Sequence, residues 1–195
     1  MLAAMSYGEA SAEDVEDEMK ALASVLVRQR NARGYASMTS FTSTDKTFSF
    51  VVKDGNKRFE KLMTASEAEL EKNSGMKAAV GAAKNALAGG PDLSNGAYFW
   101  DGRDIKTNYK NHFKVRHGIK FSCPEHNIYG IAESTKLVKL NKTVKKRSKG
   151  KIISEETVEV GRYDHIYVST AAFGGTIFWK NNEEYMAVTK AKAHK

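Results

Sequence analysis

The sequence has little cysteine, little proline and no long apolar run, and each absence excludes a class of protein. Cys123 is the single cysteine among 195 residues, which excludes an internal disulfide and a multi-cysteine zinc site. Only 2 prolines are present, so a long proline-rich linker is excluded. No apolar run approaches the roughly 20 residues that a membrane-spanning helix needs. The opening MLAAM lacks the length and the basic flank of a secretory signal, so we expect another component to carry the domain to its destination.

The positive charge is concentrated in one stretch of the chain. The formal net charge is +8, and acidic residues cluster between Glu9 and Glu18. By contrast, residues 136–151 hold eight basic side chains. This regional basicity predicts a polyanionic partner, for which a nucleic acid and an anionic wall polymer are both suitable.

The first part of the sequence has the pattern of helices. Apolar residues recur at helical spacing over 12–32, with acidic residues at the start and arginines at the end, as the helix dipole favours. Residues 57–72 and 76–87 predict two further helices, and a short extended piece is expected at 48–52.

The later part has β-branched and aromatic residues in short runs. These runs predict strands at 121–131, 135–144, 151–160 and 165–170. The second and third flank KKRSKG, which predicts a β-hairpin with a basic tip. We therefore expect one α+β domain over 1–195, helical over about 1–92 and β-rich over about 93–186, in which a small antiparallel sheet covers one side of a groove.

The segment from Tyr7 to Glu13, which we expect at the start of the first helix, contains the first candidate chemistry. Glycoside hydrolysis needs a carboxylic acid that stays protonated near neutral pH and can protonate the leaving oxygen. Glu9 and Glu13 are four residues apart, so they share one face if both lie on a helix. The alternative is that both are solvated acids that complement the helix dipole.

A second candidate is the aromatic segment from Asn95 to Gly102. Three consecutive aromatic residues stand there between glycines, and sugar rings stack on aromatic side chains. Asn95, Tyr98, Trp100 and Asp101 are suited to a saccharide-binding cleft. A buried strand whose aromatic residues belong to the core is the alternative.

Histidines and the single thiol give weaker signals. His126 and Tyr129 are candidates for the lining of a groove. The histidines lack an HExxH-type pair, so we expect no metal site and no cofactor. Cys123 lies three residues before His126, but Pro124 intervenes and no cysteine-protease signature surrounds it, so a structural thiol is the favoured interpretation.

Two blocks of sequence resemble a known family. YGEASAED with the following MKALASVLVRQRN resembles the opening motif and helix of spore-cortex-lytic, germination-type cell-wall hydrolases, and ALAGGPDLSNGAYFW resembles their second block. The chain looks still closer to the lysozyme-type C-terminal domains of bacterial type VI secretion effectors. The resemblance covers roughly residues 3–101. Ser11 stands where the family has arginine, and Ala12 where it has glycine.

The resemblance implies a lysozyme-like helical core and a peptidoglycan hydrolase, or muramidase, that cleaves the β-1,4 bond between N-acetylmuramic acid and N-acetylglucosamine. Glu9 takes the place of the catalytic acid, and Glu13 that of the second glutamate, which would hold the proton, position a water or stabilise positive charge. Hydrolysis and lytic transglycosylation both remain open. The substrate-binding candidates are Tyr7, Asn95, Tyr98, Trp100, Asp101, His126 and Tyr129.

The same resemblance implies an antibacterial effector domain that acts in the periplasm or cell wall of target bacteria. Its expected partners are peptidoglycan and an immunity protein, with no nucleic acid and no membrane insertion. The basic hairpin supports an alternative from another class, a nucleic-acid-binding or nuclease toxin domain. A non-catalytic wall-binding module is a third interpretation.

Overall fold

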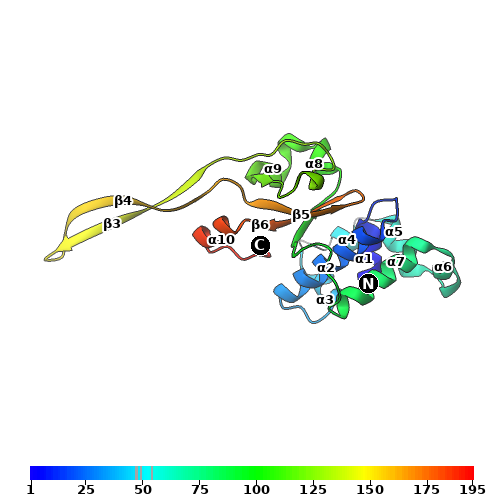
Figure 1. Cartoon of the computed structure of the whole chain (residues 1–195). Coiled ribbons are helices and arrows are strands. Elements are labelled where there is room, and N and C mark those ends of the chain that lie inside the picture. The colour runs from blue at the N-terminus through cyan, green and yellow to red at the C-terminus, as the bar shows by residue number, and fades with distance from the viewer. Residues whose placement is uncertain (47, 49, 54) are drawn as a thin grey trace.

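A computed structural model describes residues 1–46, 48, 50–53 and 55–195 and shows an α+β fold (Figure 1). The helices of the first half of the chain gather at one end, and β5 (Tyr167–Phe173) and β6 (Thr176–Asn181) run through the middle. A long hairpin of β3 (Val138–Ser148) and β4 (Lys151–Tyr163) projects away from the rest. The α+β class expected from the sequence is confirmed.

The helical part is built around α1, α2 and α7, which pack against one another. Its helices are α1 (Leu2–Glu9), α2 (Glu16–Ala32), α3 (Met38–Thr44), α4 (Phe50–Lys53), α5 (Lys57–Thr64), α6 (Glu67–Lys72) and α7 (Ser74–Leu87). Buried alanines on α7, at positions 79, 82 and 83, allow its backbone to approach its neighbours closely. The predicted helix over 76–87 is therefore confirmed.

The other helix boundaries differ from the prediction, for local reasons. The helix expected over 12–32 begins at Glu16, and α1 precedes it as a separate helix. Asp14 has a φ of 54°, which interrupts a right-handed helix between them. The helix expected over 57–72 is divided because Ser66 starts a new helix with a capping box to Glu69. The extended piece expected at 48–52 is wrong where it overlaps α4, and residue 49 lies outside the described residues.

The main sheet has the strand order β1-β6-β5-β2, with β1 (Phe99–Asp101) and β2 (Ile119–Lys120) at its edges. Strands β1, β6 and β5 are antiparallel, as predicted, whereas β2 runs parallel to β5. The strand predicted over 121–131 is wrong, because that segment contains the single turn η2 (Pro124–His126).

The sheet separates two apolar clusters. Phe178 on β6 packs into the helical core, whereas its neighbours Ile177 and Trp179 belong to a second cluster. This division follows from the alternation of side chains along a strand. The second cluster is covered by the segment 102–137, which includes α8 (Asp104–Thr107), η1 (Tyr109–Asn111) and α9 (Phe113–His117). The chain therefore forms a sheet with a different layer on each face.

The predicted hairpin is confirmed and extends further than expected, from Val138 paired with Tyr163 to Ser148 paired with Lys151. Nearly all of its side chains are exposed. Its base contacts α10 (Glu183–Thr189), where the rings of Tyr163 and Tyr185 lie 5.1 Å apart. None of the helices in the described ranges is long and apolar enough to cross a membrane.

Candidate functional site

Glu9 is the last residue of α1, and its side chain is half-buried. Its Oε2 accepts a hydrogen bond of 3.2 Å from the indole Nε1 of Trp100 on β1. The negative end of a helix dipole disfavours a charged carboxylate at this position. The sequence interpretation placed Glu9 at a helix start, where the dipole acts in the opposite sense, and the structure corrects it.

Glu13 lies in a different environment. It is exposed on the turn between α1 and α2, four residues after Glu9 but outside both helices. The expectation that the two glutamates share one helix face is therefore wrong, because α1 ends at Glu9.

Glu18, which sequence reasoning did not select, is a fully buried carboxylate. Its Oε2 accepts hydrogen bonds from the backbone N–H and the hydroxyl of Ser11, at 3.0 and 2.7 Å. Its Oε1 accepts from the N–H of Gly175 and the hydroxyl of Thr176, at 3.1 and 2.7 Å. Glu18 thus joins the segment directly after Glu9 to the turn between β5 and β6.

A signal for Glu18 was present in the sequence. Glu18 lies four residues before Leu22, seven before Val25 and eleven before Gln29, and all four are buried along one stripe of α2. A carboxylate within an otherwise core-facing stripe needs buried donors, because an unpaired buried charge is strongly destabilising.

Tyr129 lies beside the same turn. Its hydroxyl donates a 2.5 Å hydrogen bond to the carbonyl oxygen of Gly175. Burial raises the pKa of Tyr129, and the nearby charge of Glu18 raises it further. Gly174 must be a glycine here, since its φ is 54° and an added Cβ would lie 2.4 Å from Glu18 Oε2.

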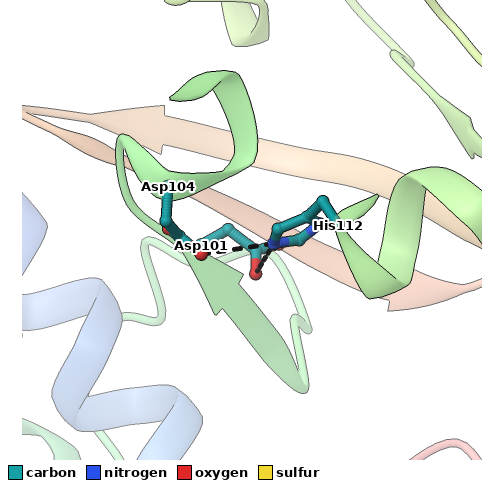
Figure 2. A group of neighbouring side chains, drawn as sticks. All are labelled: Asp101, Asp104 and His112. Atoms are coloured by element: carbon teal, nitrogen blue, oxygen red, sulfur yellow. Dashed lines mark ion pairs between the residues drawn. The ribbon is translucent and has the colours of Figure 1, made fainter. Parts of the chain in front are cut away.

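Asp101 follows Trp100 on β1 and takes part in a separate ion cluster (Figure 2). Its Oδ1 lies 2.8 Å from Lys114 Nζ and 3.3 Å from His112 Nε2. His112 Nε2 is also 3.3 Å from Asp104 Oδ2. Because consecutive strand residues point to opposite faces, Asp101 is directed away from the helical core into which Trp100 packs.

The hydrogen bond to Asp101 raises the pKa of His112, and the charges of Asp101 and Asp104 act in the same direction. Burial and the charge of Lys114 oppose this increase. The cluster therefore favours a protonated imidazole that neutralises part of the acidic charge.

The same group offers the geometry of a metal site. One atom each from Asp101, Asp104 and His112 lies within 4.8 Å of the others. Among the described residues, Asp101 Oδ2 and His112 Nδ1 are buried without a hydrogen-bond partner. The ammonium of Lys114, however, already lies against Asp101 and supplies positive charge where a cation would bind. The arrangement fits an internal ion network better than a metal centre.

The rings of two predicted sugar-binding residues, Tyr7 and Tyr98, lie against arginine guanidinium groups. Tyr7 is buried, and the guanidinium of Arg58 lies 3.9 Å above its ring. Tyr98 is half-buried, and the guanidinium of Arg28 lies 5.6 Å from its ring centroid. The structure therefore places Tyr7 in the helical core rather than on an accessible surface.

Asn95 and His126 belong to a different region from Glu9. Asn95 lines an open groove of about 790 Å³ at the base of the hairpin, and Glu9 is not among its lining residues. His126 Nδ1 is 2.9 Å from the hydroxyl of Ser169, which also lines this groove. Burial lowers the pKa of His126.

No protein-family model, curated protein or solved structure matches this chain. Among the predicted binding residues, Trp100 donates a hydrogen bond to Glu9.

Proposed function

We propose that this chain is a glycoside hydrolase of bacterial peptidoglycan in which Glu9 is the general acid. One observation carries the proposal: a half-buried carboxyl at the carboxyl end of a helix accepts the indole N–H of a tryptophan. The helix end disfavours the ionised form. The indole N–H hydrogen bond favours it, so the proposal requires that the helix end and partial burial outweigh this bond and keep Glu9 protonated near neutral pH.

The chemistry follows from the position of that proton. Glu9 would transfer it to the glycosidic oxygen as the bond to the sugar C1 breaks and positive charge develops on the ring. The half-exposed ring of Trp100 would stack against the apolar face of a sugar. Glu13, on the exposed turn after α1, would help to position the attacking water.

The substrate class rests on the sequence resemblance and on the positive charge of the chain. We propose that the bond cleaved joins N-acetylmuramic acid to N-acetylglucosamine, in the periplasm or wall of a target bacterium. An antibacterial enzyme of this kind implies an immunity protein in the cell that makes it. Attack by water and closure by the 6-hydroxyl of the muramic acid give products that differ by one water.

Glu9→Gln tests the proposal, with Glu13→Gln as the matched control. The Gln side chain keeps an acceptor for the indole N–H but cannot donate the acidic proton, so clearance of purified sacculi should fall by about 10²–10⁴-fold. Glu13→Gln should lose less than about tenfold, since it removes only assistance from an exposed residue. Mass spectrometry of the muropeptides identifies the bond and the product form.

Circular dichroism and thermal unfolding should show both variants folded like the wild type. A folded Glu9→Gln protein with full activity would contradict the assignment of the acid. A wild-type protein that releases no muropeptides would contradict the function itself.

A further inference from the structure

The end of the β3–β4 hairpin differs in charge from the rest of the hairpin. The nine residues 146–154, named here the arm tip, contain Lys146, Arg147, Lys149 and Lys151 and no acidic residue. Closer to the body, two of the basic residues are paired: Lys145 with Glu155 at 2.9 Å and Arg162 with Glu159 at 2.6 Å. Within the described ranges, no ion pair involves a cation of the arm tip. The tip therefore presents uncompensated positive charge.

The arm tip also exposes two large aliphatic side chains. Ile152 is 44% and Ile153 65% accessible to solvent. Ile152 is paired across the hairpin with Arg147, and Ile153 is the additional residue at a register shift in the ladder. The tip therefore combines exposed apolar side chains with uncompensated positive charge.

The tip is also far from the remainder of the molecule. β4 has 13 residues, which at about 3.3 Å per residue extend roughly 40 Å. Its base is supported by α10, whereas the tip projects into solvent (Figure 1). A partner can therefore contact the tip without contacting the helical part.

We propose that the arm tip binds the surface of an anionic lipid bilayer. The cations would contact the lipid phosphates, and both isoleucines would enter the boundary between headgroups and acyl chains. This inference does not depend on the proposed hydrolase activity. If both hold, the arm keeps the enzyme next to a membrane.

Other kinds of partner are less complementary to the arm tip than a lipid bilayer. A nucleic acid would neutralise the cations but leave Ile152 and Ile153 in water, and the tip has no aromatic side chain on which bases could stack. Two copies joined tip to tip would bring like charges together. The sequence alone predicted no membrane insertion, and the exposure of both isoleucines is the observation that changes this expectation.

Vesicle co-sedimentation tests the proposal with phosphatidylcholine vesicles, with and without phosphatidylglycerol. The full chain should sediment only with the anionic vesicles. Lys146→Gln/Arg147→Gln/Lys151→Gln should weaken binding about 100-fold, since each charge near an anionic surface contributes about fivefold. Lys57→Gln/Lys84→Gln/Lys110→Gln removes the same charge from exposed positions outside the arm and should change binding less than about threefold.

The contribution of the two isoleucines to binding distinguishes a lipid partner from a polyanion. Ile152→Ser/Ile153→Ser should weaken binding to anionic vesicles at least about tenfold and leave retention on immobilised RNA unchanged. The Ile153→Trp variant should bind anionic vesicles at least as tightly as the wild type. Its tryptophan fluorescence should shift to the blue when these vesicles are added. Circular dichroism checks that each variant is folded.

Three results would overturn the proposal. The first is a wild-type chain that does not sediment with anionic vesicles. The second is an Ile152→Ser/Ile153→Ser variant that binds them within twofold of the wild type, and the third is an Ile153→Trp emission that does not shift. The second result, together with tight retention on RNA, would assign the tip to a polyanion instead.

Discussion

Four donors compensate the burial of the Glu18 carboxylate, and two of them come from residues more than 150 positions away in the sequence. A hydrogen bond to a charged group is stronger than one between neutral groups, and removal of the carboxylate leaves all four donors without their acceptor. Because Ser11 follows Glu9 by two residues, Glu18 also positions the chain beside the proposed acid.

Glu18→Ala should lower the free energy of unfolding by about 3–5 kcal/mol, because it leaves several buried N–H and hydroxyl donors without an acceptor, at about 1–3 kcal/mol each. Urea denaturation measures the change. Glu16→Ala is the matched control on the same helix, since Glu16 is exposed and forms a surface ion pair with Lys20, and it should cost less than about 1 kcal/mol. Equal decreases in the free energy of unfolding of the two variants would contradict a stabilising role of the hydrogen bonds to Glu18.

His112 makes stability depend on pH. Its pKa is raised in the folded chain above the ordinary 6.5, chiefly by the hydrogen bond to Asp101. A raised pKa stabilises the fold fully below the ordinary value, and this contribution is lost as the pH rises through the folded-state pKa. The Asp101–His112 pair should therefore stabilise the protein in mildly acidic solution.

His112→Asn should accordingly be most destabilising at pH 5–6, relative to the wild type, and progressively less so above pH 7. Urea denaturation of both proteins across this range measures the difference. His117→Asn, on the exposed end of α9, is the control and should show a flatter profile. A difference that grows as the pH rises would contradict the assignment.

At the scale of the element, the two glycines of α7, Gly75 and Gly81, have different surroundings. Gly75 lies against the side chain of Asp14, and an added Cβ would be 2.4 Å from the Asp14 carboxyl. Asp14 cannot move easily, because it forms a 2.6 Å ion pair with Arg58. Gly81, in the same helix, has nothing within 4 Å of an added Cβ.

Opposite effects are therefore expected from the same substitution at two positions of one helix. Gly81→Ala should stabilise the protein by about 0.5–1 kcal/mol, because alanine restricts the unfolded chain more than glycine. Gly75→Ala should destabilise it by about 1–3 kcal/mol through steric overlap with Asp14. Thermal unfolding distinguishes the signs, and two substitutions with the same sign would refute the packing described for Gly75.

At the scale of the whole molecule, the hairpin arm contributes little to the folded body. An isolated two-stranded ribbon is at best marginally stable in water, and the arm is held mainly at its base by α10. The two apolar clusters lie on the sheet and do not include the arm strands.

Removal of residues 141–160, with Leu140 joined to Gly161 by Asn-Gly, should leave the fold intact. These two residues are paired across the hairpin, so a two-residue turn can close it. The free energy of unfolding should remain within about 1 kcal/mol of the wild type, and binding to anionic vesicles should be abolished. A shortened protein that fails to fold would show that the arm supports the body.

The local sequence pattern was sufficient to predict the α+β class, the helix α7 and the β3–β4 hairpin. These features depend on the spacing of apolar residues and on turn residues that are near in sequence, such as Lys149 and Gly150, which both have positive φ. The concentration of basic residues in that hairpin was equally visible, because charge is read directly from composition.

Tertiary contacts decided the features on which the site depends. Glu18 can be buried because Gly175 and Thr176 supply donors from the far end of the chain. Asp101 is paired with Lys114 because β1 places its side chain on the face covered by α9. Such pairings leave no periodic signal, since the free energy of a buried charge depends on which distant groups surround it.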